Sequence, residues 1–317
     1  MITGLKRLAL VPALVFAVSA ATSAKAQDFI NVLTGGTSGV YYPLGVALSE
    51  IYGQNIEGVR SQVQATKASV ENLILLQDGR GEIAFSLGDS MVLGYEGDEE
   101  AGFREPLTKL RRVAAIYPNY IQVVATAESG IKTLADLEGK SLSVGAPRSG
   151  TELNARAILG AAGMSYDDLG RIEYLPFAES VELMKNRQID ATLQSAGLGV
   201  ASIRDLSTTN AISVVEIPTD LIEQIGAPYA PGTIPAGTYQ GQDADVSTAT
   251  VVNYLVTHED VPEETVYQMT KLLFEHLDQL KAAHNAAGVI ALDKAVDENP
   301  VPLHPGAERY YKEAGVL

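Results

Sequence analysis

The sequence predicts an α/β fold divided into two lobes, with a ligand cleft between them. Three observations support this prediction. Short β-rich runs alternate with helical patterns near the N-terminus, the same order of elements returns in the middle of the chain, and a loop rich in glycine and hydroxyl residues follows a strand in each unit. Such alternation favours a parallel sheet with flanking helices. Two loops of this kind, each at the start of a helix, suggest that both units contribute to one cleft.

The first unit has a βαβαβ pattern. Pro43 falls in the first turn of the first expected helix, where the missing N–H of proline costs least. Strands are expected at 29–33, 59–64 and 83–86, and helices at 42–52 and 69–77.

The second unit repeats the order of elements without repeating the sequence. Tyr117-Pro118-Asn119 separates two expected strands at its start. Strands are expected at 112–116, 120–125, 141–144, 172–175 and 189–194, and helices at 151–162 and 179–186.

The C-terminal third is expected to complete the first lobe. Residues 228–245 are rich in Gly, Pro, Thr and Tyr and predict a connector or a cleft-lining loop. A strand at 246–256 and one long helix at 263–287 are expected after it. Tyr310 and Tyr311 in the tail are expected to dock on the first lobe. We therefore predict lobe one from 27–118 plus 236–317 and lobe two from 119–235. Two crossings between the lobes would form a hinge.

The N-terminus has the pattern of an export signal. Lys6 and Arg7 precede an apolar run, and Ala24-Lys25-Ala26 fits an A-x-A cleavage site. The run is too short to span a membrane. We predict a signal peptide at 1–26, cleavage after Ala26, and a mature periplasmic protein; a retained N-terminal anchor is the alternative that the small residues at the cleavage point disfavour.

Charge and cysteine content exclude several classes of protein. The chain carries a net charge of −16, and loss of the three basic residues of the predicted signal peptide lowers it to −19. Such a charge argues against nucleic acid and anionic membranes as partners. The chain has no cysteine, so disulfides, thiolate metal sites and cysteine nucleophiles are excluded. A monomer is expected.

The first glycine-rich loop, at 34–39, lies between the first strand and the first helix. Backbone N–H groups at a helix start can hold an anion or a carboxylate. The loop is not a dinucleotide fingerprint, because Thr34 stands at the first glycine of G-x-G-x-x-G. A tight turn without a ligand remains an alternative.

The second loop, at 145–152, contains the spacing of a capping box. Ser149 and Glu152 fit S-x-x-E, so Ser149 could simply cap its helix. Such a cap would still leave the N–H groups of Gly150 and Thr151 pointing outward. The neighbouring Arg148 could grip a carboxylate or form a surface ion pair.

The third candidate stretch is 64–72, where Thr66 or Ser69 could cap the next helix and Lys67 could face either a ligand or solvent. Catalytic and cofactor motifs are absent. The four histidines lack the spacing of metal ligands, there is no G-x-S-x-G elbow, and Leu134 stands at the first glycine of a P-loop. We expect no catalysis, cofactor or metal.

Together these motifs resemble the TAXI family of solute-binding proteins, which serve TRAP (tripartite ATP-independent periplasmic) transporters. The resemblance covers nearly the whole mature chain in the family's order. The matching segments are 34–43, 66–72, 117–118, 144–152, 189–191, 234–239 and 302–307. The resemblance implies a type II periplasmic-binding-protein fold that closes on a small solute, usually a dicarboxylate or amino acid such as 2-oxoglutarate or glutamate, and delivers it to TRAP membrane subunits.

The family motifs also imply which residues bind the solute. Arg148 departs from the family pattern, which has glycine there, so it could contact a second carboxylate or point away. Asp89 could serve the ammonium of an amino acid. The implied ligand contacts are Ser38, Tyr42, Thr66, Ser69, Ser149, Gly150 and Thr151, with Asp89 and Tyr117 lining the cleft and Gln194 and Gly197 closing it from lobe two.

Two other functions remain open from the sequence. A subunit that senses a solute for a membrane signalling partner would have the same features. An exported hydrolase would need a nucleophile or an acid–base pair in the cleft, which the sequence does not offer.

Overall fold

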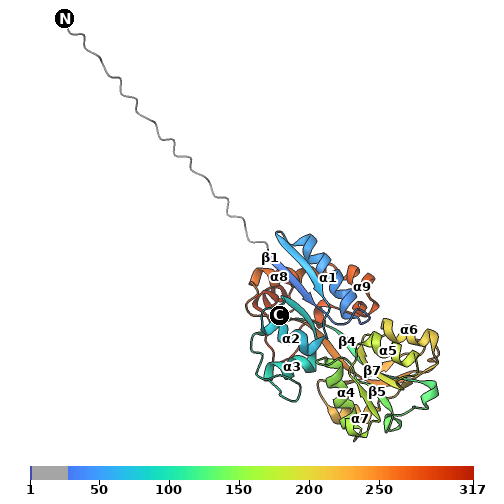
Figure 1. The fold of residues 1–317 in the computed structure, drawn as a ribbon. Helices are drawn as coiled ribbons and strands as arrows, with labels where there is room; N and C mark the ends of the chain where they lie inside the picture. Colours follow the sequence, from blue (N-terminus) through green and yellow to red (C-terminus); the bar gives the residue numbers. More distant parts are fainter. Residues whose placement is uncertain (2–27) are drawn as a thin grey trace.

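The computed structural model describes Met1 and residues 28–317, and the predicted signal peptide, apart from Met1, lies outside the described residues. Ten strands form one twisted mixed sheet in the order β2-β1-β3-β10-β4-β7-β5-β6, with β8 paired to β4 and β9 to β10. Figure 1 shows two groups of helices, one around each half of this sheet. The molecule is therefore an α/β protein with two lobes.

The first half begins with the predicted βαβαβ unit. β1 pairs in parallel with both β2 and β3, as the alternation predicted. The bounds are β1 Asp28–Leu33, α1 Tyr41–Asn55, β2 Val59–Gln64, α2 Ser69–Gln77, β3 Ile83–Leu87 and α3 Gly88–Glu96.

The second half repeats the α/β order with shorter strands. β5 pairs in parallel with β6 and β7. The bounds are β5 Ser141–Ser143, α4 Gly150–Ala161, β6 Arg171–Glu173, α5 Phe177–Lys185, β7 Ala191–Ala196, α6 Ala201–Thr209, β8 Ile212–Val215, α7 Thr219–Ile225 and β9 Ala230–Ile234.

Two long strands, β4 Leu110–Thr126 and β10 Val246–His258, belong to both halves. The first part of β4 pairs with β10, and its last part pairs with β7 and β8. The prediction of two strands interrupted at Tyr117-Pro118-Asn119 is wrong, because the sheet continues through Pro118, opposite Val252. The predicted lobe boundaries fall within β4 and just after β9, and they stay predictions.

Two further predictions in the C-terminal third are corrected. The connector contains β9, an edge strand that accommodates Pro231 because it pairs only with β10. The long helix is broken at His276 into α8 Glu263–Glu275 and α9 Leu277–Ala283. His276 has non-helical backbone angles, and the break directs α9 onto α1 while α8 packs on α10.

The C-terminal helix α10, Pro305–Glu313, docks on the first half as expected. The Tyr310 ring stacks on Phe274, with centroids 5.9 Å apart. The Tyr311 hydroxyl donates to the Val113 carbonyl at 2.8 Å. This docking ties the end of the chain to β4.

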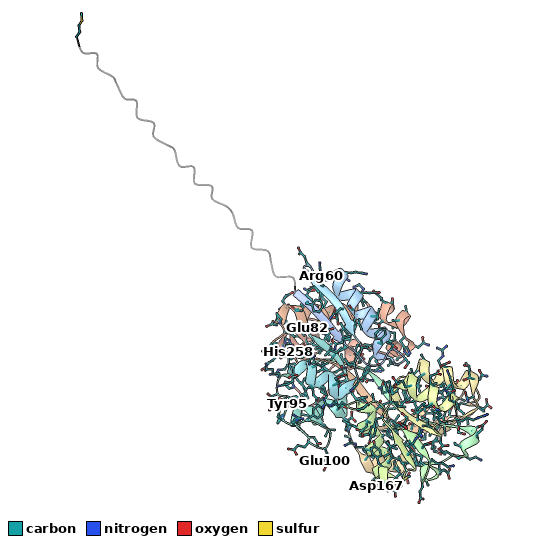
Figure 2. All side chains as sticks on the ribbon, viewed as in Figure 1. Arg60, Glu82, Tyr95, Glu100, Asp167 and His258 are labelled. Atoms are coloured by element: carbon teal, nitrogen blue, oxygen red, sulfur yellow. The ribbon has the colours of Figure 1, made fainter. Side chains whose placement is uncertain are left out.

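Each half has apolar side chains packed between sheet and helices. Ile30, Leu48 and Met269 belong to the core of the first half, and Leu142 and Ile158 to that of the second. Figure 2 shows charged side chains such as Arg60 and Asp167 on the outside. Among the described residues, no helix combines the length and apolar character of a membrane span.

Candidate ligand-binding cleft

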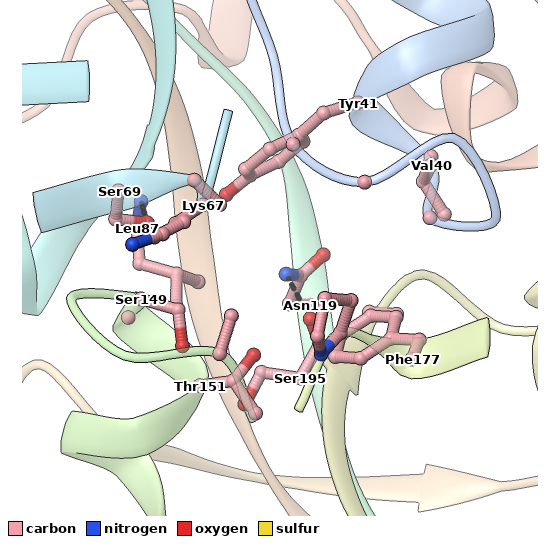
Figure 3. Close-up of a pocket in the computed structure, with 18 of the residues that line it drawn as sticks. Val40, Tyr41, Lys67, Ser69, Leu87, Asn119, Ser149, Thr151, Phe177 and Ser195 are labelled. Carbon is pink, nitrogen blue, oxygen red and sulfur yellow. Dashed lines mark hydrogen bonds between the residues drawn. The ribbon is translucent and has the colours of Figure 1, made fainter. Parts of the chain in front are cut away.

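A cleft lies between the two halves at the carboxyl ends of several strands. It encloses about 660 Å³, counting the space open to solvent. Four helices, α1, α2, α4 and α5, begin at its wall, as Figure 3 shows in part. The lining residues are Gly35, Gly36, Gly39, Val40, Tyr41, Thr66, Lys67, Ala68, Ser69, Leu87, Asn119, Ala146, Ser149, Gly150, Thr151, Pro176, Phe177, Ser195 and Ala196.

The starts of these helices leave backbone donors for a ligand. Val40, Ala68 and Pro176 are the N-cap residues of α1, α2 and α5, and none provides a side-chain cap. The first N–H groups of a helix have no partner within the helix. Because the positive ends of four helix dipoles meet here, the cleft favours a negatively charged ligand.

The start of α4 depends on a capping hydrogen bond to Ser149 and on a tight turn at Gly145. Ser149 Oγ accepts the Glu152 N–H at 3.2 Å, as predicted, so the N–H groups of Gly150 and Thr151 are left over. The Glu152 carboxylate does not complete the capping box by binding back to the Ser149 N–H. Its Oε1 instead lies 2.7 Å from Arg156 Nε. Gly145 has φ +95°, and a Cβ there would lie 2.7 Å from Thr151 Cγ2. The turn therefore requires glycine.

The two halves touch where α4 meets α2. The Glu71 N–H donates to the Arg148 carbonyl at 3.2 Å. A Cβ on Gly150 would lie 2.7 Å from Leu87 Cδ1 and 2.8 Å from Ser69 Oγ. Glycine at position 150 thus allows the second half to approach the first this closely.

The start of α2 is organised by Thr66. Its hydroxyl donates to the Thr34 carbonyl at 2.8 Å and accepts the Ala68 N–H at 2.9 Å. Ser69 Oγ accepts the Leu87 N–H at 3.1 Å, which ties the start of α2 to the end of β3. Neither Thr66 nor Ser69 is the N-cap residue of α2, so that part of the prediction is wrong: Ala68 is the N-cap, with φ 72°.

A chain of hydrogen bonds crosses the floor of the cleft from one half to the other. The Tyr41 hydroxyl donates to Asn253 Oδ1, and Asn253 Nδ2 donates to Asn119 Oδ1 at 2.8 Å. Asn119 Nδ2 then donates to the Ser195 carbonyl at 2.9 Å, the bond drawn beside Asn119 in Figure 3. These polar groups are buried and paired, so the floor is rigid.

Among the described residues that line the cleft, one side chain is charged, and it is positive. Lys67 is exposed at the edge of the cleft, next to the start of α2. Within residues 28–317, no Asp or Glu lines the cleft. In a chain with a net charge of −16, this leaves a locally positive surface around the helix starts.

The structure brings together only some of the residues predicted to bind the solute. Thr66, Ser69, Ser149, Gly150 and Thr151 line the cleft. The others lie around it: Ser38 and Tyr42 are half-buried beside Gly39 and Tyr41, Arg148 is exposed, and Asp89, Tyr117, Gln194 and Gly197 are buried outside the lining.

Arg148 has an unusual backbone. Its φ of 62° lies in the left-handed region, which glycine adopts freely and which is uncommon for arginine. A glycine at this position would adopt the same conformation without strain. The carbonyl of Arg148 accepts a hydrogen bond from α2, and the residue is exposed to solvent.

Asp89 is a buried carboxylate behind the cleft. It accepts hydrogen bonds from Asn154 Nδ2 at 2.6 Å and from the Tyr229 hydroxyl at 2.9 Å, and its other oxygen accepts the Ser90 N–H at 2.6 Å. Burial raises the pKa of Asp89 more than these hydrogen bonds lower it. Asn154 and Tyr229 belong to the second half, so Asp89 joins the two halves.

Tyr41, Asn119 and Ser195 are lining residues that the sequence reasoning missed, and Phe177 is another. Tyr41 carried a usable signal, since it directly precedes Tyr42 at the start of the first helix. Asn119 and Ser195 gave none, because both lie in strands whose pairing partner is distant in the sequence.

The comparison with known families gives the class of this protein. Residues 32–315 match the NMT1-like family, so the chain belongs to that family.

Solved structures of low sequence identity share its fold. PhnD1 from Prochlorococcus marinus, in complex with methylphosphonate, is 9% identical with TM-score 0.59, covering 92% of this chain and 100% of that one. The alkanesulfonate-binding protein SsuA from Xanthomonas axonopodis pv. citri, bound to MOPS, is 13% identical with TM-score 0.52, covering 92% and 93%. A structure described as a periplasmic transporter is 12% identical with TM-score 0.57, covering 92% and 94%. The predicted two-lobed periplasmic-binding-protein fold is thereby confirmed.

Proposed function

We propose that this protein is a periplasmic solute-binding protein that closes on a small carboxylate and delivers it to the membrane subunits of a TRAP transporter. One observation carries the proposal: four helices begin at a cleft that is lined by no acidic side chain of the described residues. A carboxylate there would accept hydrogen bonds from unpaired backbone N–H groups and gain from the helix dipoles.

The ligand is held from both halves in this proposal. The N–H groups of Gly150 and Thr151 and the Thr151 hydroxyl bind from the second half, and the start of α1 binds from the first. Closure excludes water and strengthens these hydrogen bonds. Ser38 and Tyr42, half-buried beside the lining, stay part of the proposal as ligand contacts of a fully closed form.

The relatives of known structure support an anionic ligand. PhnD1 is described with methylphosphonate and SsuA with MOPS, and both compounds carry an anionic headgroup. The choice of a carboxylate, such as 2-oxoglutarate, glutamate or a related acid, rests on the resemblance of the sequence motifs to the TAXI family. We propose binding without turnover, because the described residues that line the cleft include no triad or set of metal ligands.

The proposal that the membrane partner is a TRAP transporter also rests on the sequence motifs. A neighbouring pair of genes for a large and a small membrane subunit would favour a TRAP transporter. A neighbouring gene for an ATP-hydrolysing subunit would contradict this part of the proposal and leave the binding function intact.

The proposal is tested with the mature chain, residues 27–317, after unfolding and refolding to remove any ligand that copurifies. Thermal unfolding is measured with dicarboxylates, 2-oxo acids, amino acids, sulfonates and phosphonates. A compound that binds only the folded protein raises Tm by mass action. We expect a carboxylate to give the largest rise, and calorimetry then measures its Kd. Absence of any rise in a correctly refolded protein would contradict the proposal.

A further inference from the structure

The lining of the cleft has a charge pattern that bears on the kind of carboxylate it accepts. Lys67 is positive, four helices direct their positive ends inward, and the remaining lining side chains are uncharged. An amino acid carries an ammonium group next to its carboxylate. An ammonium has three N–H donors and no acceptor, so in a buried site it needs oxygen acceptors and a compensating negative charge.

Two acidic side chains beside the cleft, Asp89 and Glu71, already accept hydrogen bonds from within the protein. Asp89 accepts from Asn154, Tyr229 and Ser90. The Glu71 carboxylate accepts the Lys67 backbone N–H at 2.6 Å.

The acid at the start of α4 is also engaged. Glu152 accepts from Arg156 Nε at 2.7 Å and from the Tyr166 hydroxyl at 2.9 Å, and it is 4% exposed. Glu179, in the first turn of α5, is exposed to solvent and does not line the cleft. No carboxylate of these four helix starts is therefore turned toward the ligand.

The uncharged oxygen atoms that line the cleft do not replace a carboxylate as partners for an ammonium group. Asn119 Oδ1 accepts from Asn253, and Ser149 Oγ accepts from the start of α4. Thr151 and Tyr41 present hydroxyl groups. The Tyr41 proton is donated to Asn253, so this oxygen can accept from a ligand, but one hydroxyl does not neutralise a charge.

We propose that the cleft selects organic anions that lack an ammonium group, so that it binds 2-oxo acids and rejects the corresponding amino acids. This inference rests on the proposed function and narrows its ligand class. The anionic head lies at the helix starts, and the atom next to it is an oxo or hydroxyl oxygen, or a hydrogen, in place of a nitrogen cation. Discrimination arises from repulsion of the ammonium as well as from its lack of partners.

The test uses ligand pairs that differ only at the amino position. Calorimetry compares 2-oxoglutarate with L-glutamate, 2-oxoisovalerate with L-valine, and ethanesulfonate with taurine, on refolded protein. In each pair that binds, we expect Kd for the ammonium-free member to be lower by roughly tenfold or more. An amino acid that binds as tightly as its 2-oxo partner would overturn the inference.

The sulfonate pair separates this inference from the proposed function. Binding of ethanesulfonate in preference to taurine, without binding of any carboxylate, would overturn the carboxylate proposal and support rejection of the ammonium. Binding of no compound in any pair would overturn both.

A charge reversal at the edge of the cleft tests the physical cause. Lys67→Glu is expected to lower the ratio of the two Kd values, amino acid over oxo acid, by about threefold to tenfold. Lys132→Glu is the matched control, because Lys132 is exposed and does not line the cleft. If the ratio stays unchanged in Lys67→Glu, or falls equally in Lys132→Glu, then the positive charge of Lys67 is not a cause of the rejection of the ammonium.

Discussion

Two places near the centre of this protein gather hydrogen-bond donors for an anion, and the anion comes from a different source in each. At the start of α3, Asp89 supplies a carboxylate from the chain itself and receives hydrogen bonds from Asn154, Tyr229 and Ser90. At the starts of α1, α2, α4 and α5, the donors face a cleft, and the part of the chain that the structure describes lines it with no side-chain carboxylate. One site is complete within the folded chain, and the other becomes complete in our proposal when a ligand binds.

The difference shows how similar helix starts acquire different roles. Asp89 is 5% exposed and bridges the two halves, so its cluster contributes to the architecture around the cleft. Asn154 connects the two places, since its Oδ1 accepts from the Ser195 hydroxyl at 2.5 Å and Ser195 lines the cleft. Removal of the internal carboxylate should affect stability first, and changes in the cleft should affect ligand affinity first.

The largest effect is expected for Asp89→Ala. The truncation leaves the Asn154 amide and the Tyr229 hydroxyl without their shared acceptor in a buried site. We expect the free energy of unfolding to fall by about 2 to 3 kcal/mol, measured by urea denaturation.

Asp278→Ala is the control for that measurement. The Asp278 side chain is fully exposed, and its Oδ1 lies 3.6 Å from Lys281 Nζ. Because exposed ion pairs contribute little, its loss should change the free energy of unfolding by less than about 0.5 kcal/mol. Equal stability of the two variants would contradict the structural role of Asp89.

The next effect concerns closure of the cleft. Gly150→Ala places a Cβ within 2.8 Å of Leu87, Ser69 and Ser90 of the first half, so the halves must move apart. Overpacking of this kind costs about 2 kcal/mol, which corresponds to roughly a thirtyfold weaker Kd by calorimetry. Gly160→Ala lies in the same helix and meets no atom within 4 Å. It should leave Kd unchanged and raise the free energy of unfolding by up to about 1 kcal/mol.

A smaller loss of affinity is expected from a single hydroxyl. Thr151→Val keeps the shape of a side chain that lines the cleft and removes its hydrogen-bonding oxygen. We expect Kd to rise about tenfold, the value of one hydrogen bond to a charged ligand. Thr192→Val removes a buried hydroxyl that has no partner among the described residues and does not line the cleft. Similar affinity losses in both variants would refute a direct ligand contact by Thr151.

The sequence predicted those parts of the fold that local patterns determine. The bounds of β2 and α2 match the expected ranges, because strand alternation and turn residues mark them within a few positions. Contacts between distant segments decided the rest. The sequence could not predict the helix break at His276, since it depends on α9 packing against α1.

The residues of the cleft also fall into those that local motifs predicted and those that depend on contacts between distant segments. The glycine and hydroxyl motifs identified Thr66, Ser149, Gly150 and Thr151, which all line the cleft. The floor was missed, because Asn119 meets Ser195 and Asn253 only after β4 has paired with β7 and β10. Asp89 was expected to line the cleft, and the structure places it behind the lining, bonded to Asn154. Residues on one loop can be found by motif, whereas a polar floor requires the register of the sheet.

The smallest expected effect is the pH dependence that Asp89 contributes. Its folded pKa is raised above the ordinary value of 3.8, mainly because burial disfavours the charged form. The folded state therefore binds the proton more tightly than the unfolded state. It follows by linkage that Asp89 contributes stability that is complete below pH 3.8 and is lost as the pH rises through the folded pKa.

Comparison with Asp89→Asn, which does not titrate, isolates this contribution from the other acids. As the pH falls from 7 toward the ordinary pKa, the wild-type protein should gain free energy of unfolding relative to the variant. Denaturant titrations of both proteins across that range measure the difference. If the wild type instead loses stability relative to Asp89→Asn as the pH falls, then the hydrogen bonds from Asn154, Tyr229 and Ser90 outweigh desolvation. The internal carboxylate would then be held as a stabilised anion, and a ligand carboxylate at the neighbouring helix starts would be expected to bind in the same charged form.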